Sequence, residues 1–350
     1  ELDADASLAR SQPDPAVTKN PCRHGHPPSG EAYTGRHRDK ERLIAELRQG
    51  RNVFLTAPRR FGKSSLVRKV MSDLERHGTM TVYLDLDRAF SLPRFIETYR
   101  GELLGRAFRQ ARDVEQFIQH RLPTFQHWLA LDLSPTGELQ VKVAADTAPG
   151  ELYRHLFELT SLTTEYRRRR VVVCCDELRM QSNQPEGLRE TLQRLGDGPP
   201  NVAFIAVGDD PRDALIPAGF VHQALGPIED RYMQAFIKTR FENTGYRIEG
   251  EVIEDVLRIA SGHPHFIQMI CRELWNAGHL SKSVTAKHLN HALEAILETH
   301  AEHYTAIWRD LSLHQKNLLL AVVFGGGRKL FSTAFVQNHQ LGSFSTVQKS

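Results

Sequence analysis

Short apolar runs and amphipathic stretches alternate along the first two thirds of the chain. The apolar runs are rich in β-branched residues, which is typical of parallel strands that are buried on both faces. They lie at residues 52–56, 80–86, 171–177, 202–207 and 220–225. Stretches of helical period separate them, at residues 36–50, 63–71, 91–130 and 151–167. The pattern therefore predicts an α/β fold built on a parallel sheet.

Residues 131–143 depart from this alternation of long elements. Apolar and polar positions alternate on both sides of a Pro-Thr-Gly sequence at residues 135–137. Two alternating runs joined by turn residues predict a β-hairpin, here inserted between two helices.

Strand signals stop after Pro227. Helical patterns follow at residues 230–243, 249–261, 264–277 and 286–299, so we expect an all-α lid over residues 228–300. Residues 301–350 are also helical, apart from a Gly-Gly-Gly break at 325–327. They end on a Ser-Thr-Val sequence that suits the first turn of a winged-helix recognition helix. We therefore expect 301–350 to be the start of a winged-helix domain that the chain does not complete.

The chain before the first helix has a different composition. Residues 1–30 carry five prolines and many small polar residues, so they are expected to form an extended arm before a core at 31–227. Cys22, His24 and His26 lie close together in this arm. A zinc site needs a fourth ligand and a rigid frame, so a plain linker is the stronger interpretation.

A phosphate-binding loop is predicted between the strand at 52–56 and the helix that follows. Gly62 lets the backbone approach phosphates, Lys63 places a cation on the β- and γ-phosphates, and the Ser64 hydroxyl can bind Mg²⁺. The free N–H groups at the start of the helix add to the anion site. The predicted phosphate-binding residues are Ala57, Pro58, Arg59, Arg60, Phe61, Gly62, Lys63, Ser64 and Ser65. Ala57 stands where this motif usually has its first glycine, and the alternative is a basic turn that binds nothing.

Two acids end the strand at 171–177. In P-loop enzymes the first acid, here Asp176, holds Mg²⁺, and the next, Glu177, is placed to polarise the attacking water. The alternative is a strand that happens to end in solvated acids. Because one strand, 80–86, intervenes between the phosphate-loop strand and the acidic strand, the order fits the five-stranded, additional-strand branch of P-loop ATPases. The expected sheet order is 5-1-4-3-2.

Composition narrows the class of partner. The chain has 350 residues and a net charge of +3, which argues against a surface that coats nucleic acid but allows DNA binding by one small module. The four cysteines suggest reduced thiols in the cytoplasm, and Cys174 and Cys175 are expected to face opposite sides of their strand. No run of about 18 apolar residues occurs, so no membrane span is expected. The four arginines at 167–170 could bind nucleic acid, or cap the preceding helix.

Several segments resemble the STAND-type AAA+ ATPases of the archaeal-ATPase-like group. The resemblance covers most of residues 20–300. It is carried by Asn20-Pro21, Gly25, Pro27, residues 33–36, 50–53, 58–65, 82–85 and 176–177, Gly262-His263-Pro264, Gln268 and Leu274-Trp275. Such proteins usually have Phe where this chain has Cys22. They usually have Gly-Ser, at the polar sensor of the γ-phosphate, where this chain has Gly208-Asp209.

The resemblance implies further nucleotide contacts. Tyr33, Gly35 and Arg36 would lie near the base or its ribose, although Tyr33 could equally be ordinary packing. The turn at 262–264 would open a lid helix whose N-terminus faces the nucleotide. His263 or His265, beside Pro264, would then report the phosphate state, unless the histidine is merely solvated.

Three functions fit the sequence. The first is an ATP-binding, Mg²⁺-dependent ATPase whose nucleotide state moves the lid. The second is a slowly hydrolysing signalling or defence switch whose effector lies outside this chain. The third is a DNA-binding, initiator- or loader-like ATPase that uses the winged helix. A protein partner or self-association is compatible with all three.

Overall fold

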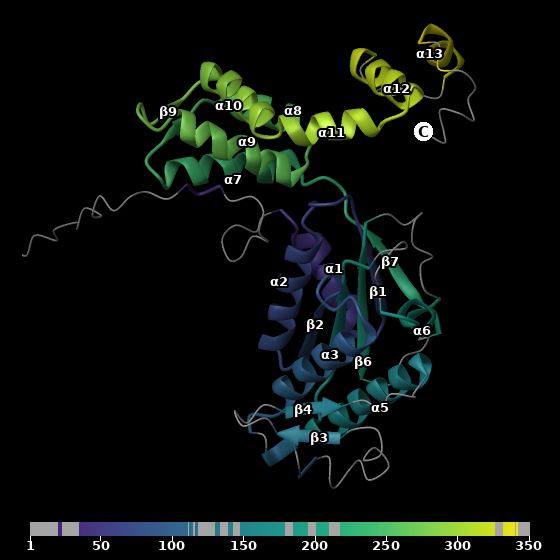
Figure 1. The fold of residues 1–350 in the computed structure, drawn as a ribbon. Helices are drawn as coiled ribbons and strands as arrows, with labels where there is room; N and C mark the ends of the chain where they lie inside the picture. The colour runs from purple at the N-terminus through teal and green to yellow at the C-terminus, as the bar shows by residue number, and fades with distance from the viewer. Residues whose placement is uncertain are drawn as a thin grey trace, which may run out of the picture.

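A five-stranded parallel sheet forms the centre of the core that precedes residue 228 (Figure 1). The computed structural model describes residues 20–22, 35–110, 112–114, 116–117, 130–133, 139–142, 148–178, 185–194, 201–209, 218–325, 332–339 and 341. The strands are β1 (Asn52–Thr56), β2 (Met80–Asp85), β5 (Val171–Asp176), β6 (Val202–Gly208) and β7 (Phe220–Ala224). Their order is β2-β5-β6-β1-β7, and every neighbouring pair is parallel. Counted in chain order from the β7 edge this is 5-1-4-3-2, which confirms the predicted fold class.

Helices cover both faces of the sheet, because successive strand residues point to opposite sides. Val53 and Leu55 pack on one side with α1 (His37–Arg48) and α2 (Lys63–Arg76). Phe54, between them, packs on the other side. That side is covered by α3 (Leu92–Ala107), α5 (Pro149–Arg167) and α6 (Leu188–Arg194). Cys174 and Cys175 likewise divide between the two faces, as predicted.

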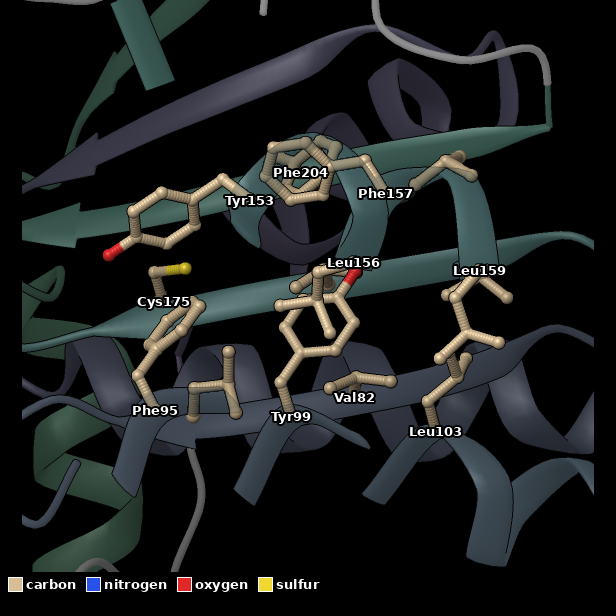
Figure 2. Close-up of a cluster of buried hydrophobic side chains, with 14 of the residues drawn as sticks. Val82, Phe95, Tyr99, Leu103, Tyr153, Leu156, Phe157, Leu159, Cys175 and Phe204 are labelled. Carbon is tan, nitrogen blue, oxygen red and sulfur yellow. The ribbon is translucent and has the colours of Figure 1, made fainter. Parts of the chain in front are cut away.

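Aromatic side chains fill the α3–α5 side of the sheet (Figure 2). The Phe157 and Phe204 rings meet edge to face with centroids 5.2 Å apart. The buried hydroxyl groups of Tyr99 and Thr160 share a hydrogen bond of 2.9 Å. This bond satisfies the polar atoms of both residues inside an apolar layer, so α3 and α5 are held together without an unpaired group.

The predicted hairpin is present as β3 (Ala130–Leu133) and β4 (Leu139–Lys142), which pair antiparallel. The predicted turn at 135–137 lies outside the described residues.

The lid consists of α7 (Asp230–Glu242), α8 (Gly250–Ala260), α9 (Pro264–Ala277) and α10 (Ala286–Thr299), which lie beyond one end of the sheet (Figure 1). These helices match the predicted ranges within two residues and share a hydrophobic cluster of their own. The lid also contains two short parallel strands that the sequence did not predict, β8 (Arg247–Ile248) and β9 (Ser283–Val284). Two residues are too few to show a period.

Two residues of the N-terminal arm, Asn20 and Cys22, contact the lid. The Asn20 side-chain amide donates to the Arg272 carbonyl and to Asn276 Oδ1, both at 3.0 Å, and Cys22 is buried in the lid cluster. The rest of the predicted arm, with His24 and His26, lies outside the described residues. The part of the chain that is described contains no cluster of three or more His, Cys, Asp or Glu side chains arranged to hold a metal ion.

The C-terminal segment forms α11 (Ala301–Asp310), α12 (Leu313–Phe324) and α13 (Thr333–Asn338), which extend away from the lid (Figure 1). Ser312 caps α12 by accepting a hydrogen bond from the Gln315 N–H. Ala321, Phe335, Val336 and Leu341 form a small separate cluster. The predicted recognition helix near 343–347 lies outside the described residues. No helix within the described ranges is both long and apolar enough for a membrane crossing.

Candidate nucleotide site

The loop between β1 and α2 leaves the first N–H groups of α2 open to a ligand. Gly62 ends the loop in a left-handed conformation, with a φ of 93°, which glycine adopts without steric cost. The first bond of the helix runs from the Leu66 N–H to the Gly62 carbonyl at 3.0 Å. Side chains in the described part of the chain do not cap the N-terminus of α2. The N–H groups of Lys63 and Ser64 are therefore placed to receive an anion.

Lys63 is folded back onto its own loop. Its side chain is 5% exposed. Its ammonium donates to the Ala57 carbonyl at 2.8 Å, the Pro58 carbonyl at 3.1 Å and Asp209 Oδ1 at 2.8 Å. The predicted phosphate cation thus has a buried position at the start of α2, and a carboxylate neutralises its charge.

Asp209 also binds a second loop cation. It directly follows β6, and Arg59 Nε donates to its Oδ2 at 3.0 Å. Burial alone would raise the pKa of Asp209, but the bonds from Lys63 and Arg59 outweigh burial and lower it. Asp209 is therefore a carboxylate at neutral pH.

Asp176 is held with both carboxylate oxygens occupied. Its side chain is 1% exposed. Oδ2 accepts a hydrogen bond from the Tyr83 hydroxyl, and Oδ1 accepts one from the Glu177 N–H at 3.0 Å. Burial raises the pKa of Tyr83 and the charge of Asp176 raises it further, so the phenol keeps its proton and donates. The Arg68 guanidinium stacks 3.9 Å from the centre of the Tyr83 ring.

Glu177 has a strained backbone. Its φ is 62°, in the left-handed region that costs a residue with a side chain about 1–2 kcal/mol. The conformation is fixed on both sides, since the Glu177 N–H bonds to Asp176 and the Leu178 N–H donates to the Val207 carbonyl at 2.7 Å. Such strain is concentrated at functional sites, where the surrounding structure holds a side chain in one direction.

Arg36 links the predicted phosphate loop to the segment that connects the core with the lid. Its buried guanidinium donates to the Gly226 carbonyl at 2.6 Å and to the Phe61 carbonyl at 3.2 Å. Gly35 lies against Ile228 at the start of the lid. These contacts give both residues a structural role, and their contact with a nucleotide stays a prediction. Tyr33 lies outside the described residues.

The lid turn lies against the phosphate loop. The Phe61 and His263 rings meet edge to face with centroids 5.0 Å apart, and Arg60 Nη1 lies 3.1 Å from His265 Nε2. Pro264 follows as the first residue of α9, where its fixed φ suits a helix start. The structure therefore brings together the loop and the lid turn, which are about 200 positions apart in the sequence.

Gly262→Ala tests how tightly this turn is packed. Gly262 has a φ of 72°, and a Cβ there would lie 2.7 Å from the Pro227 Cβ. A left-handed conformation costs alanine about 1–2 kcal/mol. We expect the free energy of unfolding of the variant to fall by more than this, because Pro227 must also move. Gly78→Ala is the control, since Gly78 has a φ of 88° but open space around it. Equal losses in denaturant unfolding would show that the Pro227 contact is unimportant.

The contact of His263 with the loop is expected to weaken in acid. Burial lowers the pKa of His263 below 6.5 and the charge of Arg60 lowers it further, against an opposing hydrogen bond to the Arg59 backbone. The unfolded chain then binds the proton more readily, so this stabilisation is complete above about pH 6.5 and is lost as the pH falls from there through the lower pKa of the folded protein. Lowering the pH from about 7.5 to 5 should reduce the free energy of unfolding more in wild type than in His263→Gln, as measured by denaturant unfolding at each pH. His155→Gln on α5 is the comparison: burial also lowers the pKa of His155, so this variant shows how much a buried histidine away from the loop contributes to the pH dependence. Identical pH profiles of wild type and His263→Gln would contradict the prediction.

Tyr83 and Asp209 belong to the site, but the sequence did not predict them as site residues. The available signal was position. Asp209 directly follows β6, at the carboxyl ends of the parallel strands, where the predicted phosphate loop and Asp176 also lie. Tyr83 lies near the carboxyl end of β2, the strand that pairs with β5.

Comparisons with known proteins agree with this architecture. Among solved structures, the chain is similar to the Walker-type ATPase PABY2304 of Pyrococcus abyssi, at a TM-score of 0.53 and 15% identity over 90% of this chain and 89% of that one. The chain has the fold of a P-loop ATPase. A family model described as a probable winged helix domain matches residues 302–350, where the sequence predicted such a domain.

Two further similarities are weaker. Orc1 of Aeropyrum pernix in complex with DNA matches at a TM-score of 0.49 and 15% identity, over 91% of this chain and 82% of that one. Cdc6p of Pyrobaculum aerophilum matches at 0.48 and 13%, over 93% and 82%. The comparison with curated proteins gives no match.

Proposed function

We propose that the protein binds and hydrolyses ATP with Mg²⁺, and that the nucleotide state moves the lid. One observation carries the proposal. The uncapped N-terminus of α2, the buried Lys63 and the acids Asp176 and Glu177 all lie at the carboxyl ends of the parallel strands, and the backbone of Glu177 is strained. Lys63 and the N–H groups of α2 would neutralise charge that develops on the β- and γ-phosphates. Glu177 would orient the attacking water and accept its proton.

The residues at the site fit a magnesium ion. Mg²⁺ binds oxygen ligands and takes few of them from protein, and the Asp176 carboxylate is fixed in orientation by Tyr83 and by the Glu177 N–H. Asp176 and the Ser64 hydroxyl would hold the ion. When bound, it would supply positive charge to the phosphate oxygens. Tyr83 would then act by keeping Asp176 aimed at one place.

The contacts between loop and lid support a conformational switch. Phe61 and Arg60, which lie in the loop, touch the histidines that begin α9. A nucleotide that reorganises the loop must therefore change the surroundings of the lid turn. We infer that this coupling transmits the nucleotide state, and that the chain is of the STAND type that its sequence segments resemble.

A second candidate is a DNA-binding, loader-like ATPase. The winged-helix match over residues 302–350 favours it, because winged-helix modules are a common means of binding DNA. The third candidate, a slow signalling or defence switch, would share the same nucleotide site.

Phosphate release measured with and without duplex DNA separates these functions. Turnover that is independent of DNA supports the ATPase switch, and stimulation by DNA supports the loader. Tight nucleotide binding with less than about one turnover per hour supports the slow switch. A folded protein that binds neither ATP nor ADP would refute the nucleotide site itself.

A further inference from the structure

All three donors of the Lys63 ammonium are occupied in the protein. A lysine carries three N–H donors, and these reach the Ala57 carbonyl, the Pro58 carbonyl and Asp209 Oδ1. A phosphate group can bind Lys63 only if one of these acceptors gives way. Of the three, only Asp209 carries a negative charge, so only its replacement by phosphate leaves the lysine charge neutralised.

Asp209 also forms an ion pair with the second loop cation, Arg59. One carboxylate oxygen binds Lys63 and the other binds Arg59, at 2.8 and 3.0 Å. The arrangement therefore places a fixed anion on two of the cations that the loop would offer to a triphosphate. The Arg59 side chain is 65% exposed and free to swing away with little loss of packing, whereas Lys63 is enclosed.

We propose that Asp209 is an internal competitor of phosphate. In the nucleotide-free protein its carboxylate occupies Lys63 and Arg59, and the phosphates of a nucleoside di- or triphosphate displace it. The proposal rests on the proposed nucleotide site and specifies what sets its affinity: binding is an exchange of anions, in which two charged hydrogen bonds must break first. Once displaced, Asp209 repels the phosphates unless a cation shields it, so it also makes nucleotide binding more dependent on Mg²⁺.

The opposite role would be a scaffold, in which Asp209 merely holds Lys63 in position for the phosphates. The two roles predict opposite signs. Removing a scaffold weakens nucleotide binding, whereas removing a competitor strengthens it. The full occupancy of the Lys63 donors and the second bond to Arg59 favour the competitor, because a scaffold would leave a donor for the ligand.

Asp209→Asn tests the proposal, since asparagine keeps the shape and one oxygen acceptor but removes the charge. Titration calorimetry with Mg-ADP and with a non-hydrolysable Mg-ATP analogue should show binding roughly ten- to a hundredfold tighter than in wild type, the order expected for a bond between charged groups. Asp209→Ser is measured alongside, so that a folding defect in one variant leaves the comparison intact.

Asp73→Asn is the matched control. Asp73 also accepts a 2.8 Å bond from a lysine, Lys40, and a bond from an arginine, Arg76, but it lies in the C-terminal half of α2. The Asp73→Asn protein should bind nucleotide with the affinity of wild type. If wild type binds nucleotide and the Asp209 variants bind equally or more weakly, the competitor is overturned and the nucleotide site stands. If none of the folded proteins binds nucleotide, both proposals fall.

Discussion

Lys63→Ala is expected to abolish measurable ATP and ADP binding while leaving the core folded. The ammonium would bridge the β- and γ-phosphates, and a hydrogen bond between charged groups contributes about 1.5–3 kcal/mol. Losing the one bond that replaces Asp209 weakens binding by roughly 1.5–3 kcal/mol, or about ten- to a hundredfold, and the Asp209 carboxylate then faces the phosphates with one cation fewer beside it. Folding should survive, because alanine is favourable in a helix and Asp209 keeps its bond to Arg59. Calorimetry gives the affinity, and circular dichroism reports the fold.

Lys69→Ala is the control for this change. Lys69 lies on the same helix, but its side chain is 39% exposed, and its Nζ makes only a long contact of 3.9 Å with Asp73 Oδ1. Its loss should leave nucleotide affinity as it was. A folded Lys63→Ala protein that still binds ATP with wild-type affinity would exclude the loop as the phosphate site.

The Lys63 and Asp209 variants have opposite expected effects although the two side chains form one ion pair. If the pair served only to stabilise the fold, both changes would lower stability and neither would strengthen binding. Opposite signs arise only if the two charges meet a third, which is the ligand. Measuring both variants therefore tests whether this ion pair belongs to the nucleotide site.

The sequence predicted the sheet well because its strands are buried on both faces. Every residue of β1, β5 and β6 is buried, and such strands appear as continuous apolar runs. The loop before α2 and the acids that end β5 lie where the sequence placed them, since each adjoins a recognisable element, and their roles at a nucleotide stay predictions. The two-residue strands β8 and β9 escaped prediction because they are held by pairing between distant segments.

Pairings between distant residues were beyond the sequence. Arg36 reaches the carbonyl of Gly226, 190 positions away, and Asp209 reaches Lys63, 146 positions away. The resemblance marked both positions, but it did not say which distant residue each side chain would contact. Tyr83 has the character of an ordinary strand aromatic, and only the register of β2 on β5 brings its hydroxyl to Asp176.

Glu177→Gln is expected to trap bound ATP, lowering hydrolysis by roughly 10²–10⁴-fold, the usual contribution of a general base. Glutamine has the same length and the same cost at a φ of 62°, so stability should not change. Asp176→Asn should instead raise the Mg²⁺ concentration needed for binding, because the amide keeps one oxygen but loses the charge that attracts the ion.

Single-turnover hydrolysis and filter binding of radiolabelled ATP separate these two outcomes. Glu165→Gln controls for the loss of one negative charge, since Glu165 is an exposed acid on α5. The strain at Glu177 makes the prediction sharp, because a backbone held in the left-handed region fixes where its side chain begins. If Glu177→Gln hydrolyses ATP as fast as wild type, the base lies elsewhere and the strain needs another explanation.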